Sequence, residues 1–178
     1  WKAIQRCLKH RNSLLRRDRI DRFELASWDQ ELTILTEKIH ELRSACMAEF
    51  ESNLSDLLRE FVKVDGIKLS YYRGWDKERD YSDILAEGFE RDQRLGYTQM
   101  GSHRADLKIT VNGQDAAELL SRGQQKLLVC ALKIAQGYVF SRITGRKSIY
   151  LVDDLPAELD DKHRKLLVHW LHTMQTQV

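Results

Sequence analysis

The most constraining feature of the sequence is an apolar stripe that repeats every three or four residues over a long stretch. Its members are Leu32, Leu35, Ile39, Leu42, Cys46, Phe50, Leu54, Leu57 and Phe61. This spacing predicts one long amphipathic helix with Ser27 as its N-cap. Such a stripe needs an apolar partner, and a first helix from Trp1 to about Arg19 supplies part of one by folding back. The two helices predict an αα-hairpin, a short coiled-coil-like arm.

Beyond this arm, the apolar pattern alternates between the period of a strand and that of a helix. The predicted strands are 67–71, 97–111 and a doubly buried 148–152, and the predicted helices are 80–94, 124–139 and 160–174. Asn112-Gly113 predicts a tight turn. The fold class expected from these elements is mixed α/β.

Composition limits the kind of protein that the chain can form. Of its 178 residues, 42% are hydrophobic and 31% charged, which predicts a soluble, folded chain. We find no apolar run long enough to span a bilayer and no signal peptide, and the missing initiator Met predicts a segment of a longer protein. Cys7, Cys46 and Cys130 fit no metal or disulfide spacing. We expect them to be buried free thiols in a reducing cytoplasm.

Positive charge is concentrated near the start of the chain, although the net charge is only +2. The candidates for a DNA-binding arm are Arg11, Arg16, Arg17 and Arg19, because a basic block attracts phosphate backbones. A solvated helix face is the simpler interpretation when no other feature is considered.

The first motif with chemical meaning is Ser121-Arg122-Gly123-Gln124, which opens the predicted helix 124–139. Ser121 and Gln124 have the spacing of a capping box. A helix start beside a glycine can bind an anion. Arg122 opposes the helix dipole there, which favours an anionic partner, although Glu118 serves equally well.

The second motif is the pair Asp153-Asp154 at the end of the predicted strand 148–152, followed by Glu158-Leu159-Asp160. Adjacent carboxylates repel each other and need a cation or a proton. Mg²⁺ with a nucleotide is a natural cation at the carboxyl end of a sheet. His163, His169 and His172 could in principle bind a metal, but ordinary helix positions explain them better.

Taken in this order, the motifs resemble the RecF family of bacterial DNA-repair proteins, which are ABC-type ATPase heads related to SMC and Rad50 proteins. The matching segments cover essentially the whole chain. They are the family's arm segment at 8–16, its Gly-Pro-His-Arg/Lys stretch at 101–107, the ABC signature at 121–124, the Walker B strand at 149–154 and the D-loop at 158–160. Ser102 stands where the family often has Pro. Arg122 replaces the first Gly of the general signature, as in RecF.

The resemblance implies the C-terminal part of an ATPase head, at 96–178, joined to a helical arm or lobe with a short strand, at 1–95. In such proteins two heads enclose ATP, and the signature of one subunit faces the γ-phosphate held by the other. This gives Ser121, Arg122, Gly123 and Gln124 a nucleotide contact in trans.

The resemblance also implies roles for the acidic residues and for the segment before the signature. Asp153 would hold Mg²⁺ through water, Asp154 would orient the attacking water, and Asp160 would lie across the dimer seam. His103 and Arg104 are candidates for nucleotide or DNA contacts.

The sequence contains no Gly-x-x-x-x-Gly-Lys-Ser/Thr loop, which lies near the N-terminus in this family. We therefore expect half an active site, with no ATP bound tightly and none hydrolysed by this chain alone. The resemblance implies that the parent protein is a weak ATPase that uses ATP and Mg²⁺. It would dimerise with ATP, bind gapped or junction DNA, and cooperate with RecO and RecR to load RecA. The alternatives are an SMC or Rad50-type structural head, a transporter ATPase subunit, or a helical interaction module without nucleotide chemistry.

Overall fold

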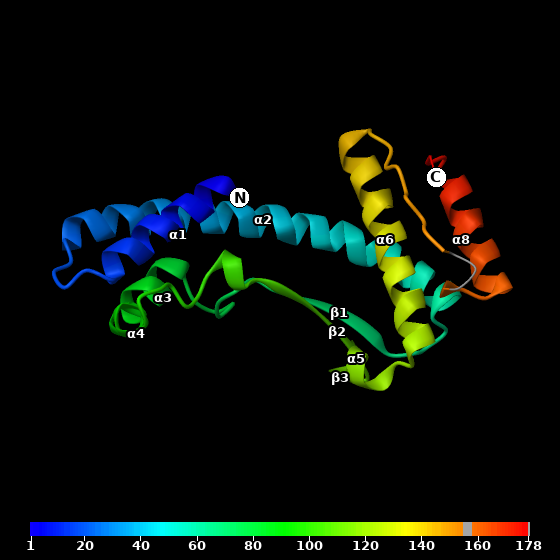
Figure 1. The fold of residues 1–178 in the computed structure, drawn as a ribbon, viewed down its shortest axis with the longest axis horizontal. Coiled ribbons are helices and arrows are strands. Elements are labelled where there is room, and N and C mark those ends of the chain that lie inside the picture. The colour runs from blue at the N-terminus through cyan, green and yellow to red at the C-terminus, as the bar shows by residue number, and fades with distance from the viewer. Residues whose placement is uncertain (155–157, 178) are drawn as a thin grey trace. The chain divides into compact units, whose positions relative to one another are not determined.

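The structure is a computed structural model that describes residues 1–154 and 158–177. The chain forms two compact units, unit 1 with Trp1–Ala45 and Tyr71–Leu107, and unit 2 with Cys46–Ser70 and Lys108–Val178. Each unit therefore combines two separate stretches, and its limits differ from the predicted division between residues 95 and 96. The cause is the long helix α2, Arg22–Phe61, which begins in one unit and ends in the other (Figure 1).

Unit 1 contains the predicted αα-hairpin. Helix α1, Lys2–Leu15, packs on α2 through a cluster that includes Ile4, Cys7 and Leu32. The N-cap prediction is wrong, because Asp21 Oδ1 accepts from the N–H groups of Phe23 and Glu24, at 2.9 and 3.1 Å. Ser27 lies inside the helix instead, where its hydroxyl donates to the Phe23 carbonyl.

The predicted helix 80–94 is two helices, α3 (Tyr81–Glu87) and α4 (Phe89–Leu95), separated at Gly88. Tyr81 and Leu85 of α3 complete the core of unit 1 together with Trp75. The predicted strand 97–111 begins only at Asp106, because Thr98 to Ser102 bond to side chains of α1, α2 and α4 instead of forming a ladder. This segment ends in a short 3₁₀ turn, η1, Ser102–Arg104.

The sheet has three strands in the order β1 (Ile67–Tyr72), β2 (Asp106–Val111) and β3 (Gln114–Asp115). β2 and β3 are antiparallel, with Val111 opposite Gln114. Asn112 and Gly113 between them have φ values of 51° and 88°. Two positive φ values are what a two-residue hairpin turn requires, so the predicted turn is confirmed.

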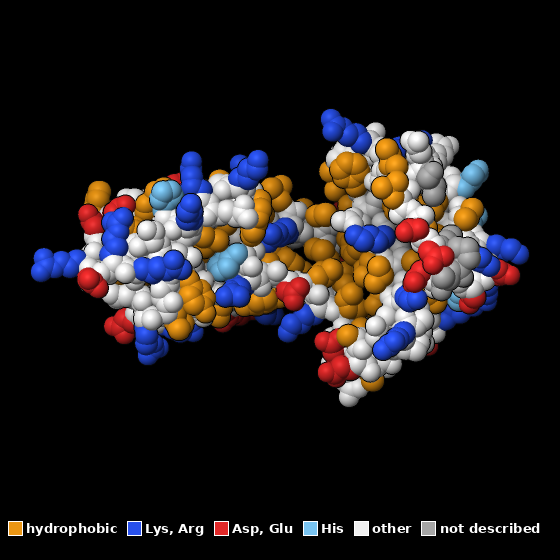
Figure 2. Space-filling model, viewed as in Figure 1, with side chains coloured by type: hydrophobic (Ala, Val, Ile, Leu, Met, Phe, Trp, Pro, Cys, Tyr) orange, Lys and Arg blue, Asp and Glu red, His pale blue; other side chains and the backbone are white. Residues whose placement is uncertain are grey.

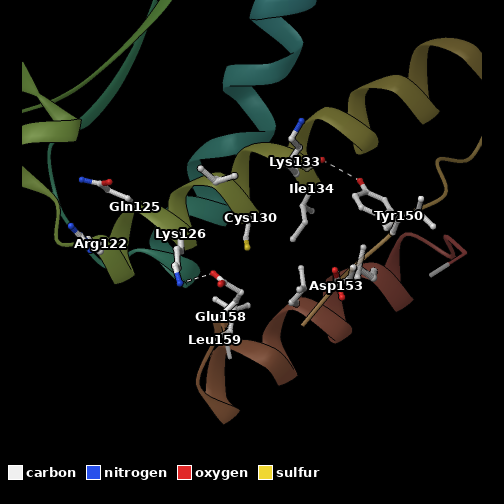
Figure 3. A pocket seen from close by; sticks show the side chains of 15 residues that line it. Arg122, Gln125, Lys126, Cys130, Lys133, Ile134, Tyr150, Asp153, Glu158 and Leu159 are labelled. Atoms are coloured by element: carbon white, nitrogen blue, oxygen red, sulfur yellow. Dashed lines mark hydrogen bonds and ion pairs between the residues drawn. The ribbon is translucent and has the colours of Figure 1, made fainter. Parts of the chain in front are cut away.

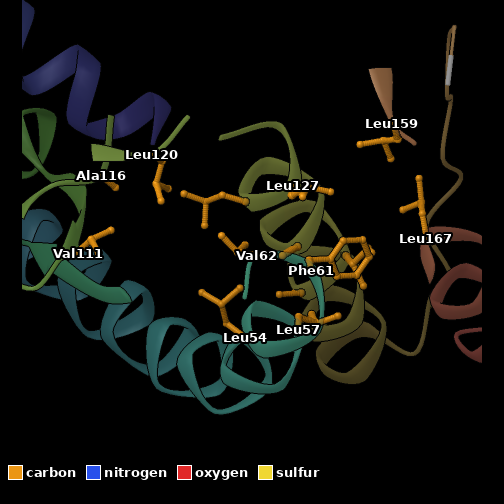
Figure 4. Close-up of a cluster of buried hydrophobic side chains, with 14 of the residues drawn as sticks. Leu54, Leu57, Phe61, Val62, Val111, Ala116, Leu120, Leu127, Leu159 and Leu167 are labelled. Atoms are coloured by element: carbon orange, nitrogen blue, oxygen red, sulfur yellow. The ribbon is translucent and has the colours of Figure 1, made fainter. Parts of the chain in front are cut away.

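Unit 2 is organised around α6, Arg122–Thr144, which follows the short helix α5, Ala116–Leu119. Its core joins α6 to the end of α2 and to α8, Asp161–Thr173, through Leu57, Phe61, Ala131, Ile134 and Leu167 (Figure 4). Contrary to the sequence analysis, α6 is long and apolar enough to cross a membrane by length and composition. Its apolar side chains instead contribute to this core, as in a central helix of a globular domain.

The prediction of a doubly buried strand at 148–152 is wrong. Within the described residues this segment forms only one parallel bridge, between Ile149 and Gln177. Leu151 is 95% exposed and Ile149 65%. A strand requires hydrogen-bonding neighbours along its length, and here the described part of the chain offers only one residue. Apolar side chains consequently gather on the surface of unit 2 (Figure 2).

The cysteine prediction is also only partly correct. Cys7 is buried and Cys130 half-buried, but Cys46 is exposed on α2.

Candidate functional site

The start of α6 has the capping box that its sequence predicts. Ser121 Oγ accepts from the Gln124 N–H at 3.3 Å, and Gln124 Oε1 accepts from the Ser121 N–H at 2.9 Å. The first N–H groups of any helix have no partner within it, so those of Arg122 and Gly123 remain free for a ligand or water. Apart from the adjacent residues and the helix's own backbone, no atom of the described residues lies within 4 Å of a Cβ placed on Gly123. The surface of the helix at Gly123 is therefore open.

Arg122 is exposed in the first turn of α6, where a cation opposes the helix dipole. Glu118 is its nearest acidic neighbour in the sequence, yet Arg122 forms no ion pair with any residue that the structure describes. The sequence left two possible counter-charges for Arg122, which are an external anion and Glu118. The absence of a described ion pair favours the external anion.

A cavity of about 750 Å³ opens beside this helix start in unit 2 (Figure 3). Arg122 and Lys126 lie at one end, and Lys126 pairs with Glu158 at 2.5 Å. Asp153 lines the cavity farther along α6, near α8. The cavity thus brings together a signature residue and the predicted metal ligand, whereas Ser121 and Asp154 are outside its lining.

Tyr150 connects α6 to the segment that carries Asp153 and Asp154. The Tyr150 hydroxyl donates to the Lys133 carbonyl at 3.2 Å. A Cβ at Gly137 would lie 1.8 Å from that hydroxyl, so only glycine leaves room for the Tyr150 ring. Asp153 and Asp154 follow as exposed residues, and Asp154 has a left-handed φ of 47°. Leu155, Pro156 and Ala157, which follow them, lie outside the described residues.

Asp160 has a structural role in addition to the predicted one. Its carboxylate caps α8 by accepting from the His163 N–H at 2.9 Å, and it also contacts His163 Nδ1. These contacts, first the backbone hydrogen bond and then the ring, lower the pKa of Asp160. A position across a dimer seam stays a prediction.

The arginines of the predicted DNA-binding arm differ in their surroundings. Arg11 is fully buried and therefore leaves the set, because a side chain with no exposed surface cannot contact DNA. Arg16 is exposed and donates to the Gly96 carbonyl, and Arg17 pairs with Glu24 at 3.3 Å. Arg19 is exposed as well.

Arg11 is the centre of a polar network that sequence reasoning missed. Its guanidinium donates to Asp29 at 2.6 Å, to Asp92 at 2.7 Å and to Thr98 at 2.8 Å. Asn12 Oδ1 accepts from both the N–H and the hydroxyl of Thr98. One feature of the sequence could have indicated this network. Arg11 occupies a position of the apolar stripe of α1, and a charged side chain that is buried at such a position needs counter-charges beside it.

The network ends at His103, one of the two residues predicted to contact nucleotide or DNA. His103 Nε2 lies 3.1 Å from the Thr98 carbonyl, and the side chain is half-buried, whereas Arg104 is exposed. Burial is the main cause that lowers the pKa of His103. The Thr98 contact opposes this effect, and Arg104 adds to it.

We expect His103 to make the stability of the chain depend on pH. Because its pKa is lower in the folded state than the usual value near 6.5, the unfolded chain binds the proton more readily. The contribution of neutral His103 to the free energy of unfolding is therefore complete above about pH 6.5 and is lost as the pH falls through the lowered pKa. Urea unfolding at several pH values should show a shallower dependence in His103→Gln than in the unaltered chain.

The pKa of His40 is also lowered, chiefly by burial. His40 is present in both proteins, so the difference between them isolates His103. His172→Gln, which removes an exposed ring, is the matched control. Equal pH dependence of the unaltered chain and His103→Gln would contradict the expectation.

Sequence comparison places these motifs in a known context. No family model matches the chain. RecF, the DNA replication and repair protein, of Cellvibrio japonicus is 69% identical over all 178 residues, and that of Chromohalobacter salexigens is 48% identical over the same length. The chain belongs to the RecF family. It spans about half the length of these relatives, 49% of each.

Solved RecF structures agree with this assignment. A structure of the recombination mediator protein RecF with ATP, in the RecFOR pathway, matches 95% of the chain and 48% of its own length with a TM-score of 0.83 at 26% identity. A second RecF structure, with ATPrS, has a TM-score of 0.81 at 25% identity. The mixed fold of helices and a small antiparallel sheet is therefore that of RecF.

Proposed function

We propose that the chain carries the signature half of an ATP-dependent dimeric ATPase that acts in recombinational DNA repair. The observation that supports this best is the start of α6, where the N–H groups of Arg122 and Gly123 have no partner within the helix and Arg122 forms no ion pair with any described residue. A γ-phosphate held by a second subunit has the charge and the acceptor oxygens that such a site needs.

In this proposal the motif at 121–124 and the pair Asp153-Asp154 have different roles in phosphoryl transfer. Ser121, Arg122, Gly123 and Gln124 contact the nucleotide across the dimer. Asp153, which lines the cavity, fits Mg²⁺ because the ion prefers oxygen ligands and keeps several waters. Mg²⁺ neutralises phosphate charge when bound. Asp154 orients the attacking water, and its side chain is one methylene shorter than Glu, which suits slow turnover.

The phosphate-binding loop would come from the remaining half of the full-length protein, so this chain alone binds no ATP tightly. An exposed apolar surface supports the idea that the rest of the full-length protein packs here. It consists of Ile149, Leu151 and Val152, and apolar surfaces of this kind are normally buried against another part of a protein. If strands from the rest of the full-length protein pair with segment 148–152, this segment would become the buried strand that its sequence predicts.

The full-length protein would bind gapped or junction DNA through Arg16, Arg17, Arg19 and Arg104, all of which are exposed. It would cooperate with RecO and RecR to load RecA in the bacterial cytoplasm, as part of the SOS response. The names of the relatives and the pathway named for the matching structures support this context.

The two carboxylates give a direct test in the full-length protein. We expect Asp153→Asn to lower Mg²⁺-dependent ATP turnover by about 10²-fold or more, because the metal loses its anionic ligand. Asp154→Asn should instead trap an ATP-bound dimer, because the variant still binds ATP but no longer orients the attacking water. Light scattering measures this dimer. Asp56→Asn, an exposed acid of α2 paired with Arg59, is the control. Turnover at the unaltered rate in Asp154→Asn would contradict the proposal.

A further inference from the structure

Segment 98–104 of unit 1 forms no helix or strand apart from η1, yet hydrogen bonds fix each of its residues. At its start, Asn12 Oδ1 accepts from the N–H and from the hydroxyl of Thr98, each at 2.8 Å. Asp92 Oδ1 accepts from the Gln99 N–H at 3.1 Å. The first two residues of the segment are therefore attached to α1 and α4.

The middle of the segment is attached to three other parts of unit 1. The Tyr81 hydroxyl of α3 donates to the Met100 carbonyl at 2.9 Å. Arg43 of α2 donates to the Ser102 carbonyl at 2.8 Å. The Gly101 N–H donates to a carbonyl of the loop after β1 at 3.0 Å. The backbone between Met100 and Ser102 is thus held from three sides of the chain.

The last two residues of the segment are fixed by bonds within it. His103 Nε2 lies 3.1 Å from the Thr98 carbonyl, and this nitrogen carries the hydrogen because a carbonyl can only accept. The Arg104 N–H donates to the Gly101 carbonyl at 2.8 Å. The position of the Arg104 backbone therefore depends on the contacts that hold the rest of the segment.

The Arg104 side chain is exposed and, within the part of the chain that the structure describes, forms no ion pair. Asp106 is the nearest carboxylate in the sequence, and its Oδ1 accepts from the Leu107 N–H at 2.8 Å. Asp106 keeps its charge without pairing with Arg104. The fixed segment consequently ends in a guanidinium that is available to an external acceptor.

Stability alone does not explain the buried charges that support this segment. Arg11 and Asp92 are almost fully buried, and replacing a buried ion pair by apolar residues is often neutral or favourable for stability. A side chain that binds a ligand, in contrast, needs surrounding residues that lock its geometry. Fixing it beforehand also lowers the entropic cost of binding. The network has the properties of such a support for Arg104.

We propose that Arg104 contacts a phosphate of duplex DNA and that Asn12 and Tyr81 are positioning residues, which hold segment 98–104 in place before DNA binds. This inference rests on the proposed function, in which the full-length protein binds DNA through exposed arginines. A guanidinium forms charge-assisted hydrogen bonds with phosphate oxygens, and such contacts orient a protein on DNA. Arg104 lies in unit 1 with the other exposed arginines of that proposal, whereas the signature and the acid pair lie in unit 2.

The test measures DNA binding by the full-length protein and its variants, with fluorescence anisotropy of a labelled duplex at several salt concentrations. Arg104→Gln removes a charge, so the slope of log affinity against log salt should become shallower by about 0.9, the value for one phosphate. Asn12→Ala and Tyr81→Phe remove no charge, yet each should make the slope shallower by at least about half of this value, because Arg104 no longer stays at its phosphate. Asn12→Ala/Arg104→Gln should have the slope of Arg104→Gln alone.

Matched controls for the two neutral substitutions lie in unit 2. Asn53 donates to the Glu49 carbonyl within α2, and Tyr138 is 40% exposed on α6. Asn53→Ala and Tyr138→Phe should keep the slope of the unaltered protein. Tyr81→Phe keeps the aromatic ring and loses only one hydrogen bond, so it still decides the question if circular dichroism shows that Asn12→Ala does not fold.

The outcomes separate this inference from the proposed function. If Arg104→Gln lowers the slope while Asn12→Ala and Tyr81→Phe lower only the stability, the network serves the fold alone, and the inference is overturned while the proposed function stands. If Arg104→Gln keeps the slope, or binds DNA normally but ATP more weakly, Arg104 is not a DNA contact and the inference is likewise overturned. If the unaltered protein binds no DNA, both proposals are wrong.

Discussion

Arg11→Met should lower the free energy of unfolding by about 3–5 kcal/mol, the typical cost of removing one partner from a buried ion pair. Asp92, with only 3% of its surface exposed, would lose its counter-charge, and the partly buried Asp29 would lose its own. Burial already raises the pKa of Asp29, and Asp92 adds to this, while Arg11 opposes both effects. Without the guanidinium, two carboxylates would face each other inside unit 1.

Urea unfolding followed by tryptophan fluorescence measures this effect. A Trp170→Phe background leaves only the tryptophans of unit 1, so that the signal reports the unit that contains Arg11. Arg17→Met is the matched control, because its pair with Glu24 is exposed and should contribute less than about 1 kcal/mol. A decrease of less than about 1 kcal/mol for Arg11→Met would show that the network is not a major source of stability.

The charges themselves can be tested separately from the packing. Adding Asp29→Asn and Asp92→Asn to Arg11→Met removes the uncompensated carboxylates, so part of the lost stability should return. The amide oxygen introduced by Asp92→Asn could still accept from the Gln99 N–H, as the Asp92 carboxylate does at 3.1 Å. A triple variant less stable than Arg11→Met would mean that the carboxylates stabilise the fold without the arginine.

Local features of the fold were predictable from the sequence, because their causes lie within a few residues. The capping box needs only Ser121 and Gln124, and the hairpin turn needs only Asn112 and Gly113. The length of α2 follows from its own periodicity. These signals need no knowledge of the rest of the fold.

Long-range features were not predictable in the same way. Arg11 meets Asp92 and Thr98 across 81 and 87 residues, and no local pattern indicates that pairing. The same contacts hold the segment after Gly96 out of the sheet, which shortened the predicted strand. The segment 148–152 has the composition of a buried strand, but composition does not supply the neighbouring strands that burial requires. The trans role of the signature is likewise a relation between two subunits.

That trans role is the second large effect that we expect. In the full-length protein, Ser121→Phe should leave ATP binding by the monomer nearly unchanged, since the phosphate-binding loop is elsewhere. It should prevent ATP-driven dimerisation and lower turnover by about 10²-fold, because the γ-phosphate loses the donors at the start of α6. Ser55→Phe, at another exposed serine of unit 2, is the control for added bulk.

Mixing decides whether the site is shared between subunits. A variant of the phosphate-binding loop has an intact signature, and Ser121→Phe has an intact loop, so each heterodimer contains one complete composite site. Since neither variant dimerises with itself when ATP is added, the dimers in an equal mixture are heterodimers with one of two sites intact, and turnover should recover to at most about half of the unaltered value. Each variant alone should remain inactive. If Ser121→Phe instead dimerises normally with ATP, the start of α6 is only a helix cap, because the free N–H groups beside Ser121 then contribute nothing to holding a second subunit's nucleotide.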